Sequence, residues 1–190
     1  MHCGGFTLVF ILQRAEKYPL LFIILMKKLY SPWRSAYIQT FSNKNKSRGC
    51  LFCNMAKADS DADNLIVSRG KFCFVVMNKY PYNSGHLLIV PYRHTSLFAK
   101  LSSEEHEEIM MMTGKCIQAL ENISGPQGFN FGANLGRTAG AGIDKHLHFH
   151  LVPRWNGDTN FMPVVGKTKV ISEYLHKTWS LLRKEFKRRK

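Results

Sequence analysis

Residues 146–155 read His146-Leu147-His148-Phe149-His150-Leu151-Val152-Pro153-Arg154-Trp155. In a β-strand successive side chains point to opposite faces, so the three histidines share one face and the apolar residues between them share the other. We therefore predict a strand that packs its apolar face on a core and ends at Pro153, because proline cannot donate to a β-ladder. One or two such histidines would be ordinary solvated residues, but three in register indicate a functional site.

The composition is that of a single globular domain. The chain has 190 residues, 45% of them hydrophobic, which is enough for one core and excludes wholesale disorder. Its net charge of +14 attracts anions such as nucleotides, polyphosphates, nucleic acid or anionic lipid without choosing among them. Basic residues concentrate in 27–48 and 183–190, where we interpret them as solubilising ends.

The cysteines indicate a reducing environment. They are Cys3, Cys50, Cys53, Cys73 and Cys116, an odd number without the spacing of a disulfide scaffold, which favours a cytoplasmic location. Cys50 and Cys53 can hold one metal ion through both thiolates, but tetrahedral zinc needs two more ligands. The pair by itself leaves zinc, redox chemistry and buried thiols open.

Several β-rich runs bounded by turn residues precede the histidines. They predict strands at 65–68, 72–78, 86–91 and 128–135, the first two forming a hairpin. A glycine-rich loop, 136–143, then leads into the strand predicted for the three histidines, and such loops let backbone N–H groups approach phosphate oxygens.

Two helices are predicted from capping and periodicity. Ser102 with Glu105 three residues later forms a capping box, and Gly125-Pro126 ends the helix that begins there. A final amphipathic helix is predicted over 170–186. Its apolar stripe, which we expect to pack on the sheet or on a second subunit, consists of Val170, Tyr174, Leu175, Trp179, Leu182 and Phe186.

Two motifs together carry a family resemblance. The triad at 146–152 and the earlier pattern Asn78-x-x-Pro81-x-x-x-Gly85-His86-x-Leu88-x-x-Pro91 resemble the histidine triad (HIT) superfamily of nucleotide hydrolases and transferases. With its continuation to Phe161, the chain is similar to the branch of diadenosine tetraphosphate phosphorylases and related hydrolases. The resemblance implies an α+β fold with an antiparallel sheet of about five strands, two main helices and a homodimer.

The resemblance also implies a division of the chain. We expect an N-terminal extension at 1–28, a lead-in and linker at 29–49, the HIT domain core at 50–166 and a basic amphipathic helix at 167–190. The apolar runs of the extension are shorter than the roughly 20 residues that span a bilayer, so no membrane partner is expected, and a weak membrane anchor is the alternative. Our hypothesis is that translation starts at Met26, where family-like sequence begins; native protein that retains Met1 by mass spectrometry would contradict it.

The chemistry expected of the triad is nucleotidyl transfer. A neutral imidazole can attack phosphorus when one ring nitrogen is free and the other donates to a fixed acceptor, and the middle histidine of a row has neighbours that can donate to phosphate oxygens. By resemblance, His148 forms a covalent nucleotidyl-imidazole at the α-phosphate, flanked by His146 and His150. His150 serves the leaving-group side, and water or orthophosphate accepts the nucleotidyl group.

Other site residues follow from the resemblance as well. Structural zinc would be held by Cys50, Cys53, His94 and His146, with reduced cysteines as the alternative, and Mg²⁺ or Mn²⁺ would accompany the polyphosphate. Expected nucleotide contacts are Asn78, Asn134, Gly140, Gly142 and Trp155; Trp155 is nearly as compatible with a buried core position. Where shorter family branches carry Gln-Ser or Gln-Thr, this chain has Gly142-Ile143, so backbone N–H groups of 140–143 are expected to replace a phosphate-binding hydroxyl.

The leading function is thus cleavage of a dinucleoside polyphosphate such as diadenosine tetraphosphate. An alternative that keeps the nucleophile is hydrolysis of a nucleoside phosphoramidate or nucleotidylated adduct. An alternative from another class is a zinc-stabilised nucleic-acid-binding protein that uses the basic ends, against which the intact triad argues.

Overall fold

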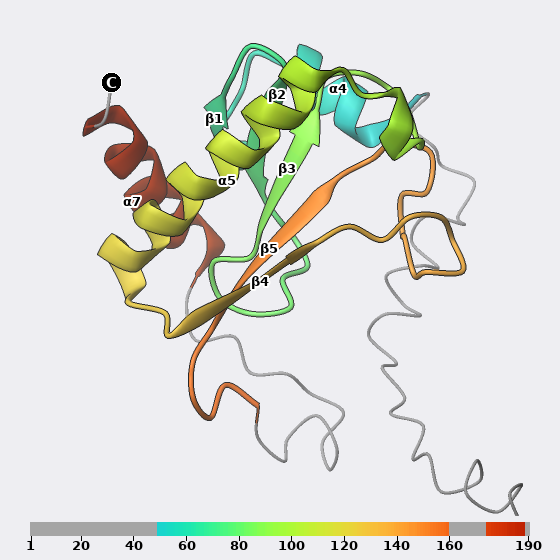
Figure 1. The fold of residues 1–190 in the computed structure, drawn as a ribbon. Helices are drawn as coiled ribbons and strands as arrows, with labels where there is room; N and C mark the ends of the chain where they lie inside the picture. The colour runs from blue at the N-terminus through green and yellow to red at the C-terminus, as the bar shows by residue number, and fades with distance from the viewer. Residues whose placement is uncertain (1–48, 160–173, 189–190) are drawn as a thin grey trace, which may run out of the picture.

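A computed structural model describes residues 49–159 and 174–188 (Figure 1). The expected N-terminal extension, nearly all of the lead-in and the start of the final helix at Val170 lie outside the described residues. In chain order the elements are α4 (Leu51–Lys57), β1 (Ile66–Arg69), β2 (Cys73–Met77), β3 (Leu87–Pro91), the 3₁₀ helix η1 (Phe98–Lys100), α5 (Ser103–Ser124), β4 (Gly128–Gly132), β5 (Phe149–Arg154) and α7 (Leu175–Arg188).

The sheet confirms the predicted α+β architecture. Its five strands have the order β1-β2-β3-β5-β4, and every neighbouring pair is antiparallel. The triad strand β5 lies between β3 and β4, where His150 is the register partner of Leu88 on one side and of Gly132 on the other. The two main helices expected are α5 and α7, and the short α4 is a third.

The bounds of β5 differ from the predicted strand. Its ladder begins at Phe149, because Leu147 instead donates its N–H to the carbonyl of Thr95 at 2.6 Å. It continues through Pro153 to Arg154, so the prediction that proline ends it is wrong. β3 pairs only with residues up to Leu151, so Pro153 has β4 as its single ladder neighbour, and an edge-like position of this kind tolerates proline.

The start and end of α5 are as predicted. Ser102 Oγ accepts from the N–H of Glu105 at 3.3 Å, and the Glu105 carboxylate accepts from the N–H of Ser102 at 2.7 Å, which is the full capping box. Gly125 ends the helix in the left-handed conformation, with φ of 54°. α5 packs on β2 and β3.

The final helix, α7, packs on β1 and α5, so the prediction that its apolar stripe packs on the sheet is confirmed for part of the stripe. Leu182 is fully buried, and Trp179 donates its Nε1–H to the carbonyl of Ile66 at 2.9 Å. Tyr174 is 86% exposed, because it precedes the helix and its carbonyl accepts the first helical N–H groups, so its place in the stripe is wrong.

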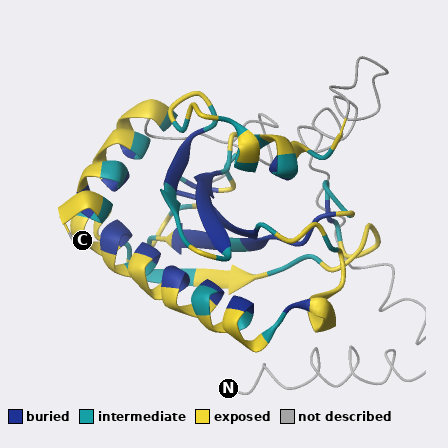
Figure 2. Ribbon diagram, turned by 90° about the horizontal axis from the view of Figure 1, so that it is seen from above, coloured by how far each residue is buried: buried dark blue, intermediate teal, exposed yellow. Residues whose placement is uncertain are grey.

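Burial follows the layers of the fold. In Figure 2 the middle of the sheet is buried, and the long helices are buried only on the sides that face it. β2 and β3 are buried at every residue, whereas β4 is partly exposed along one edge of the sheet. No helix among the described residues is long and apolar enough to cross a bilayer.

The carboxylate of Glu108 on α5 holds the turn between β1 and β2. It accepts the backbone N–H groups of Lys71, Phe72 and Cys73 at 2.7, 2.5 and 2.9 Å. A Cβ on Gly70 would lie 2.8 Å from Glu108 Oε1, which explains the glycine in this turn. Burial alone would raise the pKa of Glu108, but the hydrogen bonds outweigh it, and the pKa lies below its ordinary value.

Glu108→Gln is expected to lower the free energy of unfolding by about 1–3 kcal/mol at neutral pH, because an amide nitrogen cannot accept these bonds. A depressed folded-state pKa contributes stability above the ordinary value of 4.5, and this contribution is lost as the pH falls through the folded-state value. In urea unfolding the gap to wild type should therefore shrink on acidification. The exposed neighbour Glu107 provides the control Glu107→Gln, expected within about 0.5 kcal/mol of wild type. Equal stability of both variants at neutral pH would contradict the role of Glu108.

Candidate functional site

The predicted zinc ligands come together from three parts of the chain. Ligand atoms of Cys50, Cys53, His94 and His146 all lie within 4.8 Å of one another. His146 Nδ1 lies 3.2 Å from Cys50 Sγ and 3.2 Å from His94 Nδ1, and Cys53 Sγ lies 3.3 Å from His94 Nδ1. Tetrahedral zinc with bonds of about 2.0–2.3 Å separates its ligand atoms by about 3.3–3.8 Å, so the donor set fits a closed, structural site.

Local structure orients these ligands. Cys50 directly precedes α4 and Cys53 lies in its first turn, so a single helix start presents both thiols. His146 Nε2–H donates a hydrogen bond to the carbonyl oxygen of Pro91, 2.9 Å away, so Nδ1 carries the lone pair and faces the thiols. Both ring nitrogens of His146 are thereby engaged away from a substrate, and this geometry does not support the expectation that His146 donates to a phosphate.

His148 has the tautomer that a nucleophile requires. Its Nδ1 lies 2.9 Å from the carbonyl oxygen of His146, which can only accept, so Nδ1 carries the proton and Nε2 carries the lone pair. The ring is 6% exposed and packs against Phe52 of α4. Burial lowers the pKa of His148 and outweighs the opposing hydrogen bond to His146, which favours the neutral imidazole.

A chain of hydrogen bonds sets the tautomer of His150. His86 Nδ1 accepts the backbone N–H of Tyr82 at 3.0 Å, so His86 donates from Nε2 to His150 Nδ1, 3.0 Å away. The proton of neutral His150 is therefore on Nε2. The rings of His148 and His150 meet edge to face with centroids 5.1 Å apart, which places the two predicted catalytic groups side by side. His86 is fully buried, which suits a histidine that orients a neighbouring ring.

The two predicted asparagines lie on either side of the triad strand. Asn78 follows β2, where its Oδ1 accepts the N–H of Tyr80 at 2.9 Å and its Nδ2 lies 3.3 Å from His86 Nδ1. It therefore has the turn role that its position at a strand end favours, next to the histidine chain. Asn134 follows β4 and lines the same hollow as His150, with Nδ2 3.4 Å from the carbonyl of Gly140. Contact of either with a nucleotide stays a prediction.

The glycine-rich loop offers fewer free N–H groups than expected. The N–H of Gly140 donates to the carbonyl of Arg137 at 2.9 Å, and the N–H of Ala141 donates to the carbonyl of Gly136 at 3.3 Å. Both N–H groups are therefore used within the loop. Gly140 and Gly136 have positive φ, of 91° and 85°, as this tight turn requires. Within the described residues, the backbone N–H groups of Gly142 and Ile143 are without an assigned partner and are the ones that could bind a phosphate.

Trp155 is not brought into the hollow beside His150. Its indole donates to the carbonyl of Ser124 at 3.3 Å, and it lines a separate depression at the end of α5 with Gln127 and Gly128. It is half-buried and therefore not a core tryptophan, and its contact with a nucleotide stays a prediction.

Sequence reasoning missed the network around Asp158. The carboxylate forms a bidentate pair with Arg154 at 2.6 and 2.9 Å and accepts from Asn83 at 2.9 Å. The hydrogen bond from Arg154 drives the pKa of Asp158 far below its usual range. Asn83 also donates to the carbonyl of Pro153 at 3.1 Å, which fixes the turn before β3 against the end of β5. No local pattern signals a contact that spans 75 residues.

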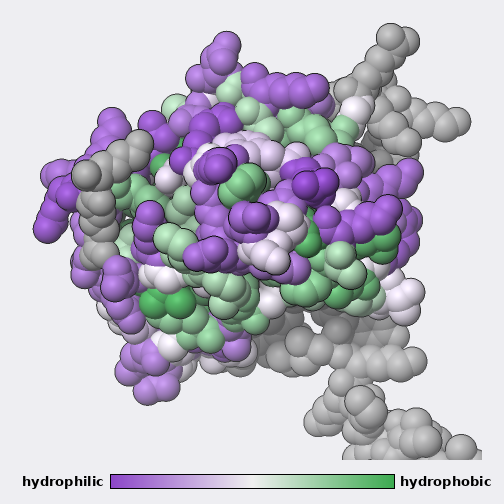
Figure 3. Space-filling view, turned by 45° about the horizontal axis from the view of Figure 1, so that its top comes forward, coloured by the Kyte–Doolittle hydropathy of each residue, from purple (hydrophilic) through white to green (hydrophobic). Residues whose placement is uncertain are grey.

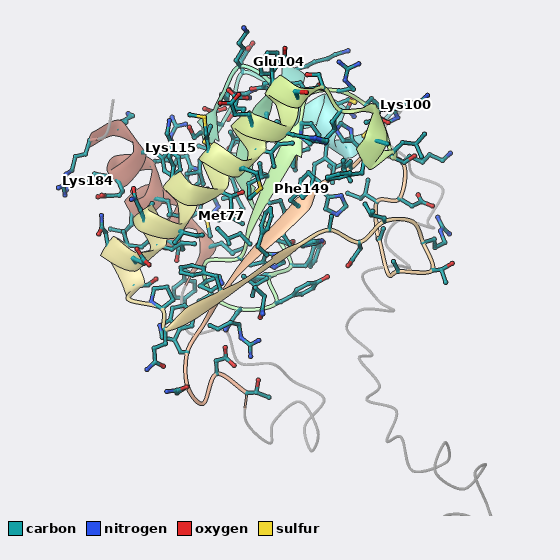
Figure 4. The ribbon with its side chains drawn as sticks, viewed as in Figure 1. Met77, Lys100, Glu104, Lys115, Phe149 and Lys184 are labelled. Carbon is teal, nitrogen blue, oxygen red and sulfur yellow. The ribbon has the colours of Figure 1, made fainter. Side chains whose placement is uncertain are left out.

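Several basic side chains of the described elements are exposed. Lys100, Lys115 and Lys184, labelled in Figure 4, are all exposed and lie on η1, α5 and α7 respectively. Of these three, only Lys184 belongs to the basic C-terminal end, and the interpretation of that end as solubilising stays a prediction.

Comparison with known proteins agrees with this geometry. The family model described as the HIT domain matches residues 59–157. A protein of Mycobacterium tuberculosis named AP-4-A phosphorylase is 41% identical over 168 residues, which cover 86% of each chain. An adenosine 5′-monophosphoramidase of Candida albicans is 28% identical over 109 residues, which cover 55% of this chain and 70% of its own length.

Solved structures show the same fold. A zinc-bound histidine triad family protein from Mycobacterium smegmatis superposes with a TM-score of 0.61 at 22% identity, covering 75% of this chain and 96% of its own. Three observations therefore indicate the same family: the histidine triad, the matching domain model, and the relative that is similar over most of its length. The chain belongs to the histidine triad (HIT) family and lies near its diadenosine tetraphosphate phosphorylase-like members.

Proposed function

We propose that this HIT-family chain is a nucleotide-processing enzyme that cleaves dinucleoside polyphosphates, with diadenosine tetraphosphate as the substrate that fits best. The observation that carries the proposal is the hydrogen bond from His148 Nδ1 to the carbonyl of His146, because it presents the Nε2 lone pair for attack. Support for the substrate comes from the relative named AP-4-A phosphorylase, which is similar over 86% of this chain.

The proposed reaction has two displacements. His148 Nε2 attacks the α-phosphorus, a P–N bond forms, and the P–O bond to the leaving polyphosphate breaks. His150 Nε2–H donates a hydrogen bond to the phosphate oxygens, and the polyphosphate leaves as an anion. Water or orthophosphate then attacks the same phosphorus, the P–N bond breaks, and His148 recovers its lone pair. Water yields AMP with release of a proton, whereas orthophosphate yields ADP.

Zinc in the cluster of Cys50, Cys53, His94 and His146 is proposed to be structural. When bound, it would fix the position of His146, whose backbone carbonyl accepts the hydrogen bond from His148 Nδ1–H. A divalent cation such as Mg²⁺ or Mn²⁺ is proposed to accompany the polyphosphate. The free cysteines among the described residues accord with our proposal of a cytoplasmic location.

Product analysis tests this function and distinguishes its two forms. The protein is incubated with diadenosine tetraphosphate, a divalent cation and ³²P-labelled orthophosphate. Label in ADP identifies a phosphorylase, and AMP with unlabelled ATP identifies a hydrolase. The absence of turnover would contradict the proposal and favour the phosphoramidate alternative, which is supported by the similarity to the Candida albicans monophosphoramidase and uses the same nucleophile.

We also propose a homodimer. Exposed apolar side chains lie on or next to η1, α5 and β4, and Figure 3 shows hydrophobic side chains reaching the surface between charged ones. The ring of Phe149 contacts two of them, Phe98 and Phe131. We call the following exposed residues the apolar cluster: Leu97, Phe98, Met110, Met111, Phe131 and Leu135. A second copy would cover this area and the open edge of β4.

Light scattering is expected to give twice the chain mass of 21.8 kDa. Met111→Lys should shift the protein toward the monomer, because it places a charge in the apolar cluster. The exposed residue Lys115 on the same helix supplies the control Lys115→Met, which should leave the mass unchanged. A monomeric wild-type protein would overturn the dimer.

A further inference from the structure

A hollow of about 500 Å³ opens beside His150, and neither Phe52 nor the residues of the metal cluster line it. Its floor is formed by two paired strands, with Asn130 and Gly132 of β4 opposite Val152 and His150 of β5. The volume lies within the roughly 300–1,000 Å³ typical of small-molecule pockets. A ligand group much larger than one phosphate therefore fits directly next to the third histidine.

We propose that this hollow binds the nucleoside of the leaving nucleotide, and that Gly132 determines this specificity. The inference rests on the proposed function, because His150 is there the residue that faces the leaving group. His148 and His150 are neighbours, so a substrate whose α-phosphorus is at His148 extends its leaving half past His150 and into the hollow.

The charge of the hollow suits a nucleoside better than a phosphate. Of the described residues that line it, Arg154 is the one with a permanent charge, and Asp158 neutralises it through the bidentate pair. A binding site for a polyphosphate would instead present unpaired cationic groups. An electroneutral pocket favours an uncharged base and ribose.

The side chains of the hollow have the chemistry to recognise a base. The ring of Tyr82 stacks on His150 with centroids 5.6 Å apart and remains 39% exposed, so it offers an aromatic wall. Asn130 Oδ1 accepts from Arg154 at 2.8 Å, which leaves the Asn130 amide nitrogen as a donor to a base acceptor. Asn134 uses its Nδ2 on Gly140, which leaves its Oδ1 as an acceptor.

Gly132 keeps the hollow open. It is the register partner of His150, and a Cβ built on it would meet no atom within 4 Å. Its φ is not positive, so the strand itself does not require glycine here. A larger side chain at this position would fit the backbone and occupy the space beside His150.

The test compares two substrates that differ only by the distal adenosine. Diadenosine tetraphosphate leaves ATP, whereas adenosine 5′-tetraphosphate leaves inorganic triphosphate. Wild type is expected to prefer the dinucleotide by at least about tenfold in kcat/KM, and Gly132→Val should reduce this preference to about twofold or less while retaining activity on adenosine 5′-tetraphosphate. The control is Gly128→Val, which adds the same side chain to β4 outside the hollow and should keep the preference.

Three results would overturn the inference, and they are distinguishable. A wild type with no preference, or a Gly132→Val variant that loses activity on both substrates equally while its unfolding temperature is unchanged, would refute the nucleoside site and leave the proposed function intact. A wild type that cleaves neither substrate would refute the proposed function and the site that rests on it.

Discussion

Replacing His148 with alanine is expected to reduce kcat/KM for diadenosine tetraphosphate by about 10³-fold or more, because it removes the atom that forms the covalent bond to phosphorus. Neither of the other two triad histidines among the described residues can take over this role. The ring nitrogens of His146 contact the Pro91 carbonyl and the thiols, and Nδ1 of His150 accepts a hydrogen bond from His86. A steady-state assay on purified protein measures the loss.

The control is His176→Ala, which removes a histidine from the exposed side of α7 and should stay within about twofold of wild type. Because His148 is buried against Phe52, the unfolding temperature of His148→Ala is measured as well, so that loss of folding is not mistaken for loss of catalysis. A loss of less than tenfold in a folded variant would show that His148 is not the nucleophile.

Replacing both Cys50 and Cys53 with serine is expected to abolish metal binding and to lower the unfolding temperature by about 10 °C or more. Metal affinity that exists only in the folded state becomes folding free energy, and each kcal/mol is worth about 2–4 °C in a chain of this size. Activity should fall too, because the side chain of His146 belongs to the cluster and its backbone carbonyl accepts the hydrogen bond that orients His148.

Metal analysis and calorimetry on protein purified without chelator measure both effects. Wild type should contain about one zinc per chain. The fully buried Cys116 lies outside the cluster, so Cys116→Ala should keep the zinc even though it leaves a cavity. A wild-type content well below one zinc per chain would contradict the zinc site and favour the alternative, in which Cys50 and Cys53 are two reduced cysteines without a metal.

Local patterns predicted the elements that depend on neighbours in sequence. The capping box of Ser102 and Glu105 needs only a spacing of three residues, and it forms as predicted. The strands also follow from their apolar runs. The resemblance, in contrast, was needed to join Cys50 to His146, since 96 residues separate them and no periodicity relates them.

What the sequence could not predict was decided by distant partners. Tyr82 stacks on His150 from a turn 68 positions earlier, and Glu108 reaches back to Lys71 across 37. Neither contact leaves a local signal. Trp155 does not line the hollow beside His150, because β5 runs on through Pro153 and the indole reaches the carbonyl of Ser124.

The measurement that tests the central claim most directly is the search for nucleotidyl-His148 itself. Wild type is mixed with excess diadenosine tetraphosphate, quenched in alkali within a turnover, digested and analysed by mass spectrometry, beside His148→Ala. One adenylyl group on His148 in the wild type, and none in the variant, is the predicted result. An adenylyl group on another residue, or turnover of the variant at the wild-type rate, would contradict it.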